Sequence, residues 1–92
     1  MIGYVYVECM IYDVHSLKAK RSVIKQTLNQ VQQKFNISMT EIDFHDLWQR
    51  TAFGLAVVAV NQSMAEKTLQ RAVDLIDSRT DLEVTIVEYE WL

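Results

Sequence analysis

The sequence predicts a ferredoxin-like α+β fold, with a four-stranded antiparallel sheet and both helices on one face. The chain of 92 residues alternates between segments with a strand period and segments with a helix period, in the order β-α-β-β-α-β. The third strand segment, residues 51–60, is apolar on both sides, which is typical of a strand in the middle of a sheet. Two right-handed crossovers joined by a hairpin then place the first and third strands at the centre.

The first strand and the first helix have clear and different periods. Residues 2–12 alternate between β-branched residues and tyrosines, as a strand with two unlike faces does. From residue 16 to residue 35 the period becomes that of an amphipathic helix, which we expect to end near Asn36 because Asn tolerates the left-handed conformation. The apolar face of this helix consists of Leu17, Ile24, Leu28, Val31 and Phe35.

The second half of the chain repeats this order. A short strand over 37–43 is followed by a polar stretch that is too long for a two-residue turn, and then by the strand over 51–60. Ser63 and Glu66 have the spacing of a capping box and predict the start of the second helix. That helix buries Ala65, Leu69, Ala72, Val73 and Ile76, and the last strand covers 82–91.

The sequence leaves open which side of the third strand faces the helices. Phe53, Leu55 and Val57 alternate with Gly54, Ala56 and Val58, and both sets are apolar.

Composition excludes several classes of protein. Half of the residues are apolar and 23% are charged, which excludes intrinsic disorder and fits a single domain over residues 1–92. One cysteine cannot form an internal disulfide or a zinc site. The apolar N-terminal segment has no Lys or Arg before it and contains Glu8, so we expect neither a signal peptide nor a membrane span, and a cytoplasmic protein.

A basic patch stands out against a net charge of −3. Four of the nine basic residues fall within eight positions at the start of the first helix: Lys18, Lys20, Arg21 and Lys25. The helix macrodipole is positive there, so each cation costs about 0.3–1 kcal/mol at low salt, and a bound anion would reverse that cost. The alternative is a solvated surface partly neutralised by Asp13 and Asp46.

Aromatic residues gather on two strands that we expect to be neighbours. Tyr4, Tyr6 and Tyr12 share one side of the first strand, and Tyr89 and Trp91 share one side of the last strand. RNA-recognition modules stack bases on such a sheet. However, Glu8 interrupts the row and these strands carry no Lys or Arg, so a homodimer through the open sheet face is the preferred interpretation.

Three further positions have a functional and a structural interpretation. Cys9 alternates with the valines of the first strand and is expected in the core rather than as a nucleophile. His15 is expected to cap the first helix, although it could orient a phosphate. Asp43, His45 and Asp46 offer metal-ligand types, but hairpin loops commonly use Asp to accept from their own amides, so we expect no metal and no cofactor.

Three segments resemble the YlxP-like family of small bacterial proteins of unknown function. They are S-L-K-A-K-R-S-V (16–23), K-F-N-I-S (34–38) and D-F-H-D-L-W-Q-R-T-A-F-G-L-A-V-V (43–58). The resemblance runs from end to end and implies a ferredoxin-like fold. It also implies a gene that often lies among translation and ribosome-maturation genes, and it brings no catalytic residues.

These observations favour a binding protein over an enzyme. Acylphosphatases share the fold, and they bind phosphate with a glycine-rich loop after the first strand. The corresponding residues 13–17 of this chain contain no glycine. Asn61 follows the third strand instead of preceding it. We therefore expect a non-enzymatic module that contacts ribosomal RNA or a ribosomal protein.

The residues expected to contact RNA phosphate are those of the basic patch together with His45, Trp48 and Arg50 of the hairpin loop. Trp48 has a second interpretation, as a side chain that packs the loop onto the sheet edge. The alternative function is a structural or regulatory homodimer that binds a protein and no nucleic acid.

Overall fold

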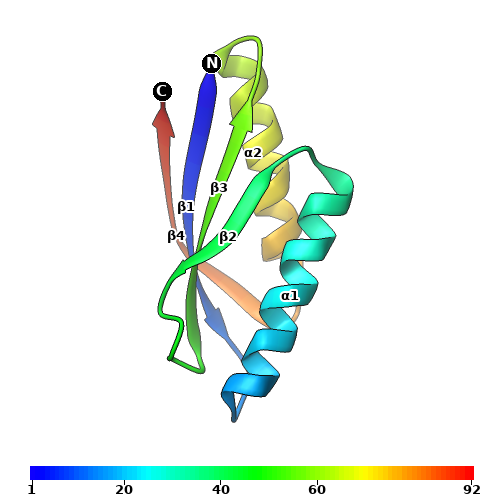
Figure 1. Ribbon diagram of the computed structural model, residues 1–92, viewed down its shortest axis with the longest axis vertical. Coiled ribbons are helices and arrows are strands. Elements are labelled where there is room, and N and C mark those ends of the chain that lie inside the picture. Colours follow the sequence, from blue (N-terminus) through cyan, green and yellow to red (C-terminus); the bar gives the residue numbers. More distant parts are fainter.

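The computed structural model describes residues 1–92 and confirms the predicted fold (Figure 1). Four antiparallel strands form one sheet in the order β2-β3-β1-β4, and both helices lie on the same face. No helix has the length and apolar character needed to cross a membrane. The elements are β1 (Ile2–Ile11), α1 (Leu17–Lys34), β2 (Ser38–Asp43), β3 (Arg50–Val58), α2 (Gln62–Asp77) and β4 (Leu82–Trp91).

The two central strands supply the middle of the core. On β1, Val5, Val7, Cys9 and Ile11 are buried under the helices, as the alternation predicted. Burial raises the pKa of the Cys9 thiol to about 12, so this cysteine is a protonated core residue at neutral pH.

The register between β1 and β3 decides which side of β3 faces the helices. Leu55 lies opposite Val5 and Phe53 lies opposite Val7, and directly opposed residues of antiparallel strands point to the same face. The set Phe53, Leu55 and Val57 is therefore in the core, and the smaller set, Gly54 and Ala56 with Val58, lies on the other face.

Helix α2 packs closely on the sheet through the five residues that its period predicted. Gly3 of β1 permits the close approach, because a Cβ there would lie 3.0 Å from the Trp91 ring and 3.1 Å from both Ala65 and Leu69. The layer between β1 and α2 has no space for a side chain at this position.

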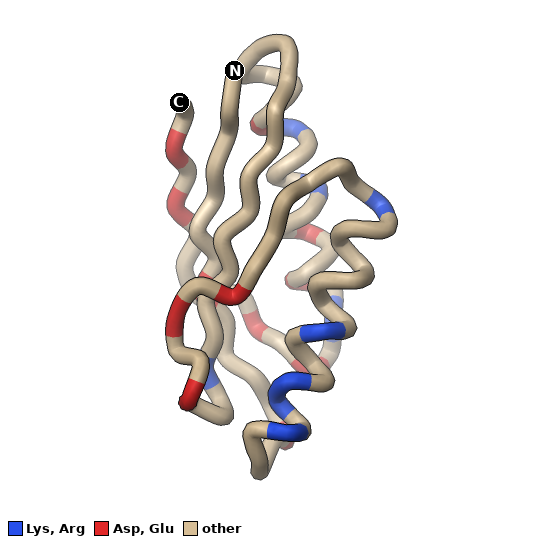
Figure 2. Tube along the Cα trace, in the orientation of Figure 1, with Lys and Arg blue, Asp and Glu red and all other residues tan.

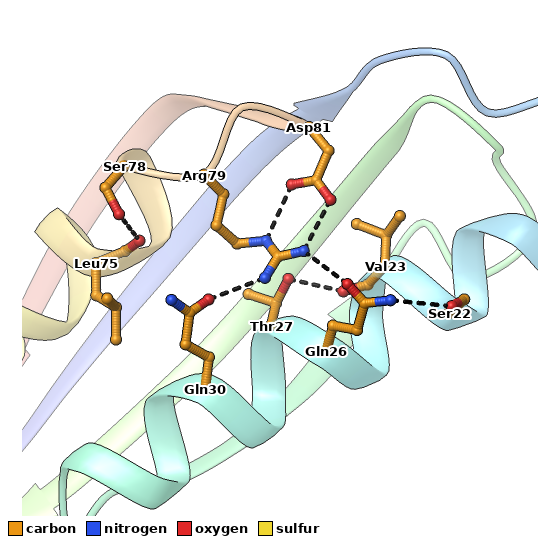
Figure 3. Close-up of polar contacts among 9 residues, drawn as sticks. All are labelled: Ser22, Val23, Gln26, Thr27, Gln30, Leu75, Ser78, Arg79 and Asp81. Atoms are coloured by element: carbon orange, nitrogen blue, oxygen red, sulfur yellow. Dashed lines mark hydrogen bonds and ion pairs between the residues drawn. The ribbon is translucent and has the colours of Figure 1, made fainter.

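Helix α1 packs on β2 and α2, near the β2 edge of the sheet. It is joined to the turn between α2 and β4 by Arg79 (Figure 3). The Arg79 guanidinium donates to Asp81 at 2.8 and 2.9 Å, to Gln30 at 2.9 Å and to Gln26 at 3.2 Å. Arg79 is thus a structural residue whose charge is fully used within the fold.

The helix ends differ in part from the predictions. The start of α1 is capped by Ser16, whose side chain accepts from the Ala19 amide at 3.0 Å, so the expected His15 cap is wrong. Its C-cap, Phe35, is extended, and no left-handed residue is needed at Asn36. The capping box was also wrong, because α2 begins earlier and Asn61 is its N-cap, accepting from the Met64 amide at 2.9 Å.

Asn61→Ala should lower the free energy of unfolding by about 1 kcal/mol, because the Met64 amide loses its acceptor. Ser63→Ala, inside the first turn, is the matched control and should have a much smaller effect. Urea unfolding of both variants measures the difference. Equal losses would mean that Ser63 contributes to the cap after all.

Candidate nucleic-acid interface

Three of the predicted phosphate contacts form an exposed row of cations on α1. Lys18, Arg21 and Lys25 are exposed, and we call them the cation row. None of them is ion-paired, because the three salt bridges of the structure are Lys20–Glu41, Arg50–Glu8 and Arg79–Asp81. Figure 2 shows these charges along the first half of α1. The first turn of α1 also has no acidic residue, so the positive helix end is not neutralised locally.

Lys20 does not belong to this surface, and its prediction as a phosphate contact is wrong. Its side chain is 1% exposed, and its ammonium lies 3.1 Å from a carboxylate oxygen of Glu41. The ammonium also donates to the backbone carbonyls of Phe44 and His45. The physical reason is position, because Lys20 precedes Ile24 by one helical turn and lies on the buried face of α1.

Lys20 holds the loop between β2 and β3 against α1. Glu41 is itself fixed by the Thr51 hydroxyl, which donates to it at 2.6 Å. Phe44 has a left-handed φ of 61°, and its amide donates to the Asp43 carboxylate at 2.7 Å. Both backbone groups of Phe44 therefore have a hydrogen-bond partner, because its amide donates to Asp43 and its carbonyl accepts from Lys20.

The loop brings His45 toward the cation row and leaves Trp48 apart from it. Arg21, Lys25 and His45 line one groove of about 410 Å³ between α1 and the loop. The exposed His45 ring has Nε2 3.0 Å from the Glu41 carbonyl. Trp48 is 47% exposed and lines a separate hollow of about 530 Å³ with Arg50.

Arg50 brings no free charge to the interface. Its guanidinium makes two hydrogen bonds to one Glu8 oxygen, at 2.8 and 3.0 Å, and lies 3.9 Å from the centre of the Phe44 ring. Sequence reasoning missed this pair, although Glu8 interrupting the aromatic row of β1 was a sign that it needed a partner.

The Glu8 pair also accounts for two pKa shifts. The hydrogen bonds from Arg50 lower the pKa of Glu8, and the Tyr6 hydroxyl, which donates to Glu8 at 2.9 Å, adds to this. Burial and the same hydrogen bond raise the pKa of Tyr6 to about 12. Tyr6 therefore remains protonated and Glu8 remains ionised at neutral pH.

The predicted aromatic face is divided between the two sides of the sheet. Tyr4 and Tyr6 lie on the side away from the helices, and Tyr12 donates to Glu83 there at 2.6 Å. Tyr89 and Trp91 lie opposite Val5 and Gly3, so they point toward the helices, and their inclusion in the dimer face was wrong. Their rings stack with centroids 5.6 Å apart, and the Tyr89 hydroxyl donates to Gln70 of α2 at 3.2 Å.

No group of three or more His, Cys, Asp or Glu side chains is arranged to hold a metal ion. The Asp43 carboxylate accepts from the loop amide described above. Asp43 and His45 thus both make hydrogen bonds to the backbone of their own hairpin.

Comparison with known proteins identifies the family. Residues 2–89 match the family described as "Protein of unknown function (DUF503)". The chain belongs to this family. It is also 50% identical over 91 residues to "Uncharacterized protein YlxP" of Bacillus subtilis (strain 168), with 99% of each chain covered. The family predicted from the three motifs is confirmed.

Lys20→Ala should lower the free energy of unfolding by about 3 kcal/mol, because it leaves the Glu41 carboxylate largely buried without its charge partner. Lys18→Ala, on the exposed side of the same helix, should change it by less than about 0.5 kcal/mol. Chemical denaturation of both variants provides the comparison. A similar small change in both would show that the buried pair contributes little.

Glu8→Gln should destabilise the fold at neutral pH, and the difference should disappear in acid. The folded state lowers the pKa of Glu8 below its ordinary value of 4.5, so this stabilisation is complete above that value and is lost as the pH falls through the folded-state pKa. Urea unfolding across this pH range tests it. Arg50→Met should remove most of the pH dependence, and a difference that grows in acid would contradict the sign.

Proposed function

We propose that this domain is a non-enzymatic RNA-binding module of translation or ribosome maturation, in which the cation row contacts phosphates. The observation that carries the proposal is that Lys18, Arg21 and Lys25 are exposed together without a carboxylate partner. Lysine and arginine form charge-assisted hydrogen bonds with phosphate oxygens. A polyanion along this side of α1 would meet several unpaired charges at once.

The position of the row within the helix supports an anionic ligand. Lys18 and Arg21 lie in the first turns of α1, where unpaired cations repel the positive end of the macrodipole. Bound phosphate would turn this unfavourable interaction into a favourable one. The free protein therefore carries an electrostatic cost that a phosphate backbone would relieve.

The loop between β2 and β3 supports RNA in particular. His45 lies in the same groove as Arg21 and Lys25, and Trp48 presents half of its side chain to solvent nearby in the chain. An exposed indole stacks on unpaired bases without regard to sequence. Lys20 fixes the backbone of the loop at Phe44 and His45, so the loop side chains project from a backbone with a defined position.

A binding role is also supported by the structural roles of the side chains that could otherwise act in catalysis. Cys9 is buried and protonated, and Glu8 is held by Arg50 and Tyr6. The Asn61 side chain, which an acylphosphatase-like mechanism would need free, caps α2. The connection with ribosomes rests on the family resemblance alone.

Lys18→Glu and Arg21→Glu should weaken binding to ribosomal particles and to single-stranded RNA without weakening the fold. Each variant should reduce the slope of log K against log salt by about 0.7–0.9 for each phosphate that the protein no longer binds. The free energy of unfolding should stay unchanged or rise by up to about 1 kcal/mol, because a repulsive charge at the helix start is reversed. Salt-dependent co-sedimentation, fluorescence titration and urea unfolding measure these quantities on the same samples.

The matched controls are the single variants Lys67→Glu and Arg71→Glu, each of which makes the same charge change on the exposed side of α2. These variants should bind almost as well as the unmutated protein. Equal losses of affinity from both pairs would indicate only a net-charge effect. Reduced stability with unaltered RNA binding in the α1 variants would mean that the cation row is structural.

A further inference from the structure

The side of the sheet away from the helices is apolar and uncovered, and we call it the open face. Its large apolar side chains include Ile2, Met10, Ile42, Val58 and Ile86, all at least 40% exposed, with Val58 at 80%. Tyr4 lies flat across β3, since a Cβ on Gly54 would be 3.1 Å from its hydroxyl and 3.2 Å from Ile42. Several exposed apolar side chains gathered on one face of a sheet indicate a docking site.

Carboxylates line the β4 edge of the open face, and one more lies at the end of β2. Glu83, Glu88 and Glu90 on β4 lie opposite Met10, Tyr6 and Tyr4, and Asp43 on β2 lies opposite Ala52. None of these four carboxylates is in a salt bridge. Figure 2 shows the acidic residues along β4, far from the cations of α1.

A groove in this face combines aromatic rings with carboxylates. It has a volume of about 380 Å³ and is lined by Tyr4, Tyr6 and Ile86 together with Glu88 and Glu90. A lysine or arginine side chain fits this chemistry, because its stem packs on apolar groups while its charge meets carboxylates and ring faces.

We propose that the open face binds a basic amphipathic helix of a partner protein. Its apolar residues would cover Tyr4, Ile42 and Val58, and its cations would enter the groove beside Glu88 and Glu90. A helix on this face would complete a three-layer arrangement of helix, sheet and helix. The carboxylate edges require the partner to be basic.

A second copy of this chain fits the open face less well. The only cation on the face is Arg50, and it is paired with Glu8. Two such faces placed together by a two-fold axis would therefore bring carboxylate edges together without any free cation to neutralise them. The cation row cannot cover the apolar surface either, because the exposed side of α1 is polar.

The test uses two synthetic helical peptides of about 18 residues, long enough to fold on the surface. One carries leucines on one side and lysines on the other, and the second has glutamate in place of every lysine. NMR titration of the full chain should show saturable binding of the lysine peptide, with shifts at Tyr4, Tyr6 and Ile86 and not along α1. The glutamate peptide should bind at least about tenfold more weakly, because it meets like charges.

Charge reversal on β4 should abolish this preference. Glu88→Lys with Glu90→Lys should weaken binding of the lysine peptide by at least about tenfold. Glu66→Lys with Asp77→Lys, the same charge change on exposed positions of α2, should stay within about twofold. Lys18→Glu with Arg21→Glu should leave the NMR shifts that the lysine peptide causes on the open face unchanged. Peptide binding and RNA binding can therefore be tested, and can fail, independently of each other.

Three results would overturn the proposal. The first is equal binding of the two peptides, and the second is no saturable binding of the lysine peptide to the folded protein. The third is a stable dimer in sedimentation experiments at micromolar concentration that Tyr6→Glu converts to a monomer, because a second copy would then be the occupant of the open face.

Discussion

The buried ammonium of Lys20 connects α1, β2 and the loop that follows β2. It is held on α1, pairs with Glu41 of β2 and donates to two carbonyls of the following loop. The loop carbonyls could not be desolvated without a donor, and the ammonium could not be buried without acceptors, so each makes the other possible. This contact adds to the apolar packing of Ile24 and Val31 on Met39, which also holds α1 beside β2.

The hairpin of β2 and β3 is held from both faces of the sheet by two charged pairs. On the helix side, Lys20 binds Glu41, and on the open face Glu8 of β1 binds Arg50 at the start of β3. Phe44 takes part in both, since its carbonyl accepts from Lys20 and its ring lies under the Arg50 guanidinium. A loop without regular structure thus gains a defined conformation from charged groups that its neighbours provide.

Periodicity was sufficient to predict the elements, whereas the site depended on contacts between distant residues. All six elements, the buried side of α2 and the burial of Cys9 are confirmed, because burial along one helix or strand is a local pattern. Tyr89 and Trp91 were misplaced because alternation separates the two sides of a strand without saying which side meets the helices. That choice is made by the register with β1, which shifts at a bulge between Glu8 and Cys9.

The fold also sorts its charges in a way that composition hides. Lys20, Arg50 and Arg79 are each paired with a carboxylate. The unpaired cations near the loop are therefore those on the outer side of α1. The acidic excess of the second half of the chain lies in part along β4, at the opposite edge of the sheet. A chain with net charge −3 thereby presents unpaired cations along the outer side of α1 and unpaired carboxylates along β4. Ligands of opposite charge can then occupy α1 and β4 of one small domain without competing, since interactions between exposed charges more than about 10 Å apart are largely screened at physiological salt.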